Sequence, residues 1–354
     1  MATMPRLNIN FKSAGTSAIT RGERGVILLV LRQAAAVSGN PVTVLTPADI
    51  PAAATAANKK YINLALIGNE TAPRKVVCYF IGTEDDLTNP FTWAQTNKAD
   101  YFVMPTVATD ELTDTVKAWI ISVKAQNNMI KAVLPNTAGN SEYIINYATE
   151  SVSVGSETYT AEQFAPRIAG IICGTSLTHS VTYATVPEAT DCSRMTEAEM
   201  DTAVNAGKLF CFFDGEKVKL SRGVNSLTTL TTDKGEVFTK IKHVEVIDLI
   251  KTDVRIYCQD YYIGKFANSF VNRCLLLSAL ETYFEGLIGD GLISTAEVSF
   301  DIDAIKTAMR TAGIDYTEMS DEEIVQYDFG THVYLKISLR LLDAIEDIDL
   351  NIEI

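Results

Sequence analysis

Few side chains in this sequence have the types and the spacing that catalysis or metal binding requires. The three histidines, His179, His243 and His332, are far apart in the chain, and no two have the spacing of a metal-ligand pair. No HExxH motif, glycine-rich phosphate loop or nucleophile elbow occurs. We therefore interpret the histidines as structural or surface residues, and we expect no enzyme, no cofactor and no metal.

Two short acidic patterns come nearest to a cation site. Asp301 and Asp303, and again Asp347 and Asp349, flank an isoleucine at strand spacing. Carboxylates in that arrangement usually form a solvated face, so we predict no metal there. Gly289-Asp290-Gly291 follows a helical pattern, and we interpret it as a helix end rather than a phosphate cradle.

The cysteines indicate a reducing compartment. No two of them form a CxxC pair, and most lie in apolar runs such as Leu209–Phe212. This favours buried, reduced thiols over redox or metal chemistry. The six are Cys78, Cys173, Cys192, Cys211, Cys258 and Cys274. We therefore expect a protein that is made and kept in a reducing cytoplasm.

The net charge of −14 disfavours polyanionic partners. No run of Lys and Arg offsets it locally, so we expect no binding to nucleic acid. The longest apolar run, Val26–Leu31, is far shorter than the roughly 20 residues of a membrane span, and the first residues lack a secretory pattern. We also expect no membrane insertion.

Hydrophobic periodicity predicts a multidomain fold of the α+β or α/β class, with mixed sheets flanked by helices. Strand-like segments at Val26–Leu31 and Arg74–Ile81, separated by a proline-rich region, predict a small β-rich domain at residues 22–88. Alternating strands and helices then predict an α/β domain at residues 89–236. Two long amphipathic helices, a shorter helix and a strand predict a C-terminal domain at residues 237–342.

The patterns also assign apolar faces to the long helices. The first is predicted to bury Ile241, Val244, Ile247, Ile250, Val254 and Tyr257, and the second Phe270, Cys274, Leu277, Leu280, Phe284 and Leu287. Before them, Leu209–Phe213 and Val218–Leu220 flank Asp214-Gly215 and predict a hairpin.

The C-terminal residues alternate between apolar and polar side chains in two runs. The first run, with apolar Val333, Leu335, Ile337, Leu339 and Leu341, predicts a strand; the second, with Ile348, Leu350, Ile352 and Ile354, predicts another. An acidic stretch, residues 343–347, separates them. Branched aliphatic side chains on an unpaired terminal strand would form an exposed apolar stripe. We interpret residues 343–354 as a C-terminal arm that needs a sheet.

The N-terminal residues follow a similar design. Leu7, Ile9 and Phe11 alternate with polar residues ahead of a small-residue stretch, so we interpret residues 1–21 as an N-terminal arm. Residues 1–24 carry a net charge of +3 and residues 332–354 one of −3, so strands from the two ends could meet in one sheet. Pattern alone leaves two alternatives: the arms pair within one subunit, or each arm completes a sheet in a neighbouring copy.

Several segments carry, in chain order, a recognisable sequence pattern. The helix opened by Thr160-Ala161-Glu162 runs into Ala169-Gly170-Ile171, a small-residue turn and Ser180-Val181-Thr182-Tyr183. The run Arg222-Gly223-Val224-Asn225 contains a Gly-hydrophobic-Asn pattern. Further segments of this kind are Gly22–Val26, Lys240–Val254, Tyr262–Lys265 and Asn272-Arg273. Together, these segments resemble contractile phage tail sheath proteins. The resemblance covers about residue 20 to the end, and the chain length suits the compact, diffocin-like type of Gram-positive prophages and R-type bacteriocins. Pro166 and Cys173 depart from the family pattern.

The resemblance implies a structural subunit that forms stacked hexameric rings around an inner tube and contracts to drive that tube through a cell envelope. It implies β-strand exchange through Leu7, Ile9 and Phe11 and through the C-terminal arm, into a sheet that uses Val333–Leu341. It further implies that the inner tube, baseplate and tail terminator proteins are partners. Lys306 and Arg310 are candidate contacts to the tube; the simpler explanation is that they lie on a solvated helix face. Such a protein would assemble in the bacterial cytoplasm and become part of a virion tail or a released bacteriocin particle.

Two other functions remain open at this point. Another self-assembling particle protein, such as a tube or capsid component, would also use terminal arms, but a sheath alone should occur in two helical forms. A cytosolic α/β enzyme would pair its termini within one subunit and carry a deep polar pocket. Nothing in the residues favours the enzyme.

Overall fold

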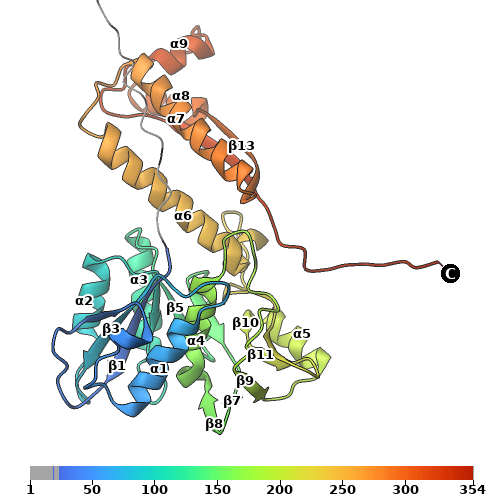
Figure 1. Ribbon diagram of the computed structural model, residues 1–354. Coiled ribbons are helices and arrows are strands. Elements are labelled where there is room, and N and C mark those ends of the chain that lie inside the picture. Colours follow the sequence, from blue (N-terminus) through green and yellow to red (C-terminus); the bar gives the residue numbers. More distant parts are fainter. Residues whose placement is uncertain (1–18, 20–23, 354) are drawn as a thin grey trace, which may run out of the picture. The chain divides into compact units, whose positions relative to one another are not determined.

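The computed structural model describes Ile19 and residues 24–353. These fall into two compact units (Figure 1). The large unit contains residues 24–249 together with residues 343–353, and the small unit contains residues 250–342.

A seven-stranded sheet forms the centre of the large unit. Its order is β10 (Lys208–Leu209), β6 (Ile144–Tyr147), β5 (Lys131–Pro135), β4 (Tyr101–Val103), β1 (Val26–Arg32), β3 (Lys75–Ile81) and β2 (Val42–Val44). Neighbouring strands are parallel except β2, which runs antiparallel to β3. Strand β1 is apolar on both faces because Ile27, Leu29 and Leu31 join one core cluster and Val26, Leu28 and Val30 join the other. This is the continuous apolar pattern of a strand in a parallel sheet.

Helices cover both faces of this sheet. α1 (Ala56–Ile67) and α4 (Ala161–Gly174) pack in the first cluster, whereas α2 (Thr88–Thr96) and α3 (Thr113–Ala125) pack in the second. α1 and α4 approach closely, since a Cβ at Gly170 would lie 2.4 Å from the carbonyl oxygen of Ala65. Thr160 begins α4 with a capping box, and Pro166 lies inside the helix.

The structure differs from the prediction for the region before residue 88. That region adds β1, β2 and β3 to the seven-stranded sheet and contains α1, where strands and loops were predicted. β1 and β3 are parallel neighbours and so need a crossover, and the segment between them that contains α1 provides it. The strands predicted at Val26–Leu31 and Arg74–Ile81 are confirmed as β1 and β3.

Two smaller sheets complete the large unit. β8 (Glu157–Thr160), β7 (Ser151–Val154) and β9 (Ala189–Cys192) form one, and β11 (Cys211–Phe213) with β12 (Val218–Leu220) forms the predicted hairpin. The remaining elements here are α5 (Glu197–Asn205) and the short 3-10 helices at Pro47–Asp49 and Glu236–Thr239.

Helix α6 (Ile241–Tyr257) begins in the large unit and ends in the small one. Burial of Ile241, Val244 and Tyr257 is confirmed, whereas Ile247, Ile250 and Val254 are only half-buried. The first turns differ from an amphipathic pattern, because residues 241–246 are all buried. In the following helix, α7 (Phe270–Gly289), burial of Leu280, Phe284 and Leu287 is confirmed; Phe270, Cys274 and Leu277 are half-buried.

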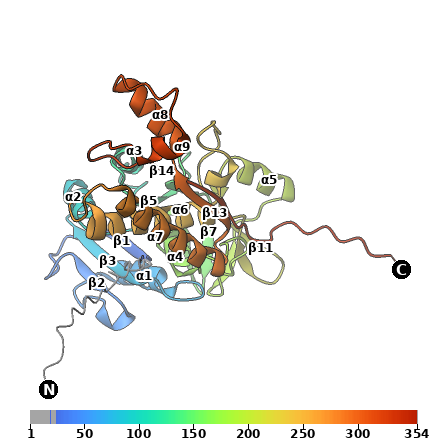
Figure 2. The same cartoon turned by 90° about the horizontal axis from the view of Figure 1, so that it is seen from above.

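The small unit combines helices with a two-stranded sheet. A π-helical turn, Cys258–Tyr262, leads to α7, and β13 (Ile293–Phe300) follows and packs against α7 (Figure 2). β13 pairs antiparallel with β14 (Leu335–Leu341). Helices α8 (Ile302–Thr311) and α9 (Asp321–Gln326) lie between the two strands in sequence and bury Ile305, Met309 and Ile324.

The six cysteines are free thiols. Cys78, Cys173, Cys192 and Cys211 are buried, as predicted, and burial raises the pKa of Cys78 to about 12. Cys258 and Cys274 are half-buried. Across the described residues, no helix is long and apolar enough to cross a membrane.

Candidate self-assembly surfaces

Residues 343–347, which we call the acidic segment, lie against the large unit without regular secondary structure. Asp343 forms an ion pair with Lys240, and its Oδ1 lies 3.6 Å from His243 Nε2. Partial burial alone would raise the pKa of Asp343, but the neighbouring Lys240 and His243 lower it below its ordinary value. The carboxylate is therefore held in its charged form.

Glu346 makes the second attachment of the acidic segment. Its Oε2 lies 3.1 Å from Arg222 Nε, and its Oε1 accepts hydrogen bonds from Ser180 Oγ at 3.2 Å and from Thr182 Oγ1. Arg222 also pairs with Asp347. The Glu346 side chain is only 9% exposed, whereas that of Asp347 is 85% exposed. One carboxylate of the segment is thus buried among donors.

The loops that receive Glu346 come from two of the segments that carry the family resemblance. The amide of Gly223 donates to Thr182 Oγ1 at 2.9 Å and brings residues 222–224 against residues 180–182. A Cβ at Gly223 would lie 2.8 Å from Val181 Cγ2, so glycine permits this close approach. The Arg222-Gly223 pair therefore shapes the site and supplies its cation.

The apolar side chains after the acidic segment project into solvent. Ile348, Leu350 and Ile352 are 70%, 78% and 80% exposed, and none of them belongs to a strand. We call these three residues the apolar stripe. Ile354, and also Leu7, Ile9 and Phe11 of the predicted N-terminal arm, lie outside the described residues. The assignment of these positions to strand exchange stays a prediction.

The predicted receiving sheet corresponds to β14 with its partner β13. β14 contains Leu335, Ile337, Leu339 and Leu341, and Val333 precedes it. Within the described part of the chain no third strand joins β13 and β14, so the sheet has free backbone edges on both sides. Such edges can accept an added strand.

An apolar groove of about 710 Å³ lies in the small unit beside β14. Val333, Leu335 and Ile337 line one part of it, and residues of α6, the π-helical turn and α7 line the rest, including Val254, Tyr262 and Leu280. Nearby apolar side chains remain exposed, for example Ile263 at 67% and Phe266 at 50%. The small unit therefore presents apolar surface next to a free sheet edge.

Lys306 and Arg310, the predicted tube contacts, both lie on α8. Lys306 Nζ lies 2.9 Å from Asp321 Oδ1, and Arg310 donates a 2.8 Å hydrogen bond to Tyr316 Oη. Both cations thus have partners within their own unit.

A network of buried charged side chains links the first half of α6 to the seven-stranded sheet. The sequence patterns did not identify this network. Lys131 Nζ lies 2.6 Å from Asp248 Oδ2 and 3.2 Å from Glu245 Oε1, and all three side chains are almost fully buried. Tyr101 and Tyr143 donate to Glu245 and Asp248 at 2.7 and 2.8 Å. Burial alone would raise the pKa of Glu245, but the positive charges of Lys131 and Arg24 outweigh that effect, so the pKa lies below its ordinary value.

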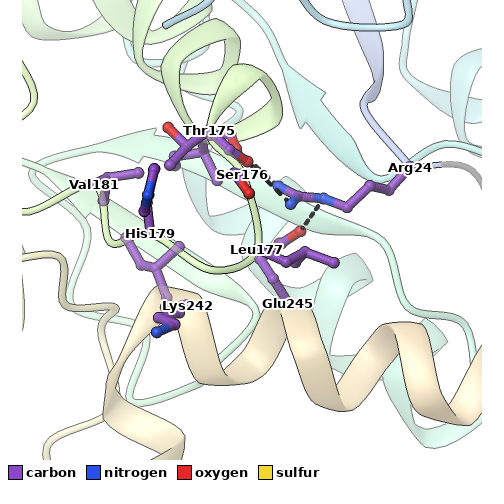
Figure 3. A pocket seen from close by; sticks show the side chains of 10 residues that line it. Arg24, Thr175, Ser176, Leu177, His179, Val181, Lys242 and Glu245 are labelled. Atoms are coloured by element: carbon purple, nitrogen blue, oxygen red, sulfur yellow. Dashed lines mark hydrogen bonds and ion pairs between the residues drawn. The ribbon is translucent and has the colours of Figure 1, made fainter. Parts of the chain in front are cut away.

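Arg24 connects the start of β1 to the same helix. It donates to the carbonyl oxygens of Ile172 and Thr175 at 2.8 and 3.2 Å, and its Nε lies 3.2 Å from Glu245 (Figure 3). The cavity beside it has a volume of about 10 Å³, room for about one water molecule. In the described ranges no group of three or more His, Cys, Asp and Glu side chains could hold a metal ion.

Comparisons with known proteins agree on one family. The model of the phage tail sheath protein central domain matches residues 83–226, and that of the phage tail sheath C-terminal domain matches residues 233–354. The tail sheath protein of Clostridium phage phiCD119 is 33% identical over the full length of both chains.

Solved structures show the same fold. The sheath tail protein of Desulfitobacterium hafniense has a TM-score of 0.69 at 20% identity, over 84% of this chain and 94% of that one. The sheath of an extracellular contractile injection system, PVC, in its contracted state has a TM-score of 0.67 at 10% identity, over 100% of this chain and 98% of that one.

Proposed function

This chain belongs to the phage tail sheath family and is a sheath subunit of a contractile tail, and from that premise we propose that its copies are linked by exchange of terminal strands. In this proposal the subunits form six-membered rings, stacked helically around an inner tube. The C-terminal arm of one copy adds to the β13–β14 sheet of a neighbour, and the N-terminal arm joins the same kind of sheet.

The observation that carries this proposal is the apolar stripe. Three branched aliphatic side chains at alternating positions are 70–80% exposed, which a subunit that works alone would avoid. The free edges of β13 and β14 and the apolar groove beside them supply the matching surface. Backbone hydrogen bonds to the edge would give affinity, and alternate side chains in the groove would give register.

Linked arm contacts explain a polymer made from soluble subunits. A single short strand gains little after the entropy of its ordering is subtracted. When each subunit is held by several neighbours, the effective concentration for each further contact rises steeply. Contacts between different surfaces of subunits in successive rings do not close on themselves and then give a helical lattice.

Contraction follows as a rigid-body rearrangement of subunits that remain tethered by their arms. The free energy would come from surface that becomes buried, so we propose no catalytic role for this chain. The proposed partners are the inner tube, the baseplate and the tail terminator proteins. Arg310 and Lys306 remain candidates for the tube contact, in which a tube carboxylate would add to or replace their present partners.

Electron microscopy of the purified protein tests the proposal. We expect long hollow tubes from the full chain, and only monomers or small oligomers after deletion of residues 348–354. The substitution Asn351→Ser, on the polar face of the same segment, is the matched control and should leave the tubes unchanged. Normal tubes from the truncated chain would exclude C-terminal strand exchange but would leave the sheath assignment intact.

A further inference from the structure

The C-terminal arm consists of two parts with different contacts. We propose that the acidic segment, residues 343–347, is a permanent anchor on the chain's own large unit, and that only residues from Ile348 onward cross to a neighbouring copy. We call residues 348–354 the crossing part, and for its position this inference rests on the proposed strand exchange. The anchor itself is a property of the single subunit.

Burial within the acidic segment is selective. Ile345 is 87% exposed and Asp347 85%, yet the Glu346 side chain between them is only 9% exposed. Its carboxylate forms an ion pair with Arg222 and accepts hydrogen bonds from the hydroxyl groups of Ser180 and Thr182. Removing a carboxylate from water is unfavourable unless donors replace the lost hydration, and here three side chains replace it. This site is therefore built for a carboxylate at that position.

The segment is held at two separate places. Asp343 pairs with Lys240 and lies near His243 at the start of α6, whereas Glu346 and Asp347 pair with Arg222 in the loop after β12. Two attachment points three residues apart fix the direction of the chain as well as its position. A single ion pair would leave the chain free to rotate about it.

The periodicity of the sequence changes where the anchor ends. Ile348, Leu350 and Ile352 share one face of an extended strand, with Asp349 and Asn351 on the other. If the strand continued backwards, Glu346 would fall on the apolar face. A strand that enters an apolar groove therefore begins at Ile348, and Glu346 belongs to a different surface.

An anchor at Asp347 limits how far the crossing part can reach. Seven extended residues, 348–354, span at most about 25 Å, at about 3.5 Å each. If about four of them pair with a sheet edge, that edge must lie within roughly 10–15 Å of the Asp347 anchor. The receiving sheet therefore belongs to a subunit in direct contact, and this distance is kept while other contacts change.

Zero-length crosslinking with a carbodiimide tests the anchor directly. The reagent joins the Lys240 amine to the Asp343 carboxylate as an amide, with loss of water. It is applied to the free subunit, and then to tubes assembled from a mixture of ¹⁴N and ¹⁵N subunits. Peptide mass spectrometry identifies the joined residues and the isotope of each. The variant Asp343→Asn must abolish this crosslink, and Asp349→Asn, in the crossing part, must leave it.

We expect the crosslink in the free subunit and, in tubes, only pairs of the same isotope. Pairs of mixed isotope would show that the acidic segment is itself exchanged, and absence of the crosslink from the free subunit would show that no anchor exists. Either result overturns the inference. If the crosslink forms but tubes never do, the proposed strand exchange fails while the anchor stands.

Discussion

Arg222 Nε lies 3.1 Å from Glu346 Oε2 and so joins a loop in the middle of the chain to its last dozen residues. The same guanidinium pairs with Asp347. Because the carboxylate of Glu346 is almost fully covered, this contact differs from an ordinary pair of mobile surface charges. In the proposed strand exchange, this contact is the point from which the arm leaves its own subunit.

Removing the cation should release the acidic segment. We expect Arg222→Gln to weaken its attachment by about 1–2 kcal/mol, a value reduced by the partial exposure of Arg222. Fluorescence anisotropy of a probe at Ile345→Cys, with Cys258 and Cys274 replaced by Ser, should fall. Arg194→Gln removes a comparable surface pair with Asp191 and serves as the control. Unchanged anisotropy in Arg222→Gln would contradict the role given to Arg222.

A polar side chain in the apolar stripe should impair assembly without affecting the fold. Leu350 is 78% exposed in the subunit, so Leu350→Asn should leave its melting temperature unchanged. Burial of a leucine in a neighbour is worth about 1.5–3 kcal/mol, so the critical concentration for tubes should rise about 10- to 150-fold. Sedimentation of tubes measures it. A lowered melting temperature would show instead that Leu350 packs within its own subunit.

Gly223 should not tolerate a side chain. The Cβ of Gly223→Ala would lie 2.8 Å from Val181 Cγ2, and relieving that overlap should cost about 1–3 kcal/mol. Gly235→Ala, where the added Cβ meets no atom within 4 Å, is the control. Urea denaturation of both variants measures the difference, and equal stabilities would mean that the two loops separate easily.

His243 should make stability depend on pH. Burial lowers the pKa of His243, and Lys240 and Lys242 act in the same direction against Asp343. A histidine whose pKa is lower in the folded state than in the unfolded state stabilises the folded state. This stabilisation is complete above the unfolded-state pKa near 6.5, and it is lost as the pH falls from there towards the folded-state pKa. His243→Gln should therefore flatten the decline in the free energy of unfolding below about pH 6.5. If the free energy of unfolding of His243→Gln declines as steeply with falling pH as that of the unchanged chain, then other groups cause the decline.

The thiols should be largely unreactive in the native protein. Burial raises the pKa of Cys78 and Cys211 to about 12 and that of Cys192 to about 11, and Cys173 is also buried. At pH 8 we expect iodoacetamide to label no more than two cysteines, Cys258 and Cys274, and all six after denaturation. Native labelling of four or more would show that the large unit opens readily.

Local patterns predicted the elements better than their arrangement. The apolar run of β1 and the hairpin around Asp214-Gly215 follow from side chains that are close in sequence. The single seven-stranded sheet does not, because β1 pairs with β4 through residues 74 positions apart, such as Ile27 and Tyr101, and no local periodicity reflects such a contact. Helix α1 was missed because three prolines precede it and its own apolar residues form no clear stripe.

The candidate surfaces were predicted to a similar degree. Alternation identified the apolar stripe and the strand at Leu335–Leu341, since a strand's period is visible in sequence. Arg222 and Lys240 were named only within segments of family resemblance, and their carboxylate partners lie more than 100 residues away. Glu245 and Asp248 could have been recognised only weakly, as two carboxylates about one turn apart on the mostly apolar start of α6.

Strand exchange between copies is the central claim, and a density map of assembled tubes tests it most directly. We expect residues 348–354 of each subunit to lie as an added strand on the β13–β14 sheet of an adjacent subunit, with residues 343–347 on their own large unit. Density in which residues 348–354 pair with their own subunit, or extend unpaired along the tube, would contradict it.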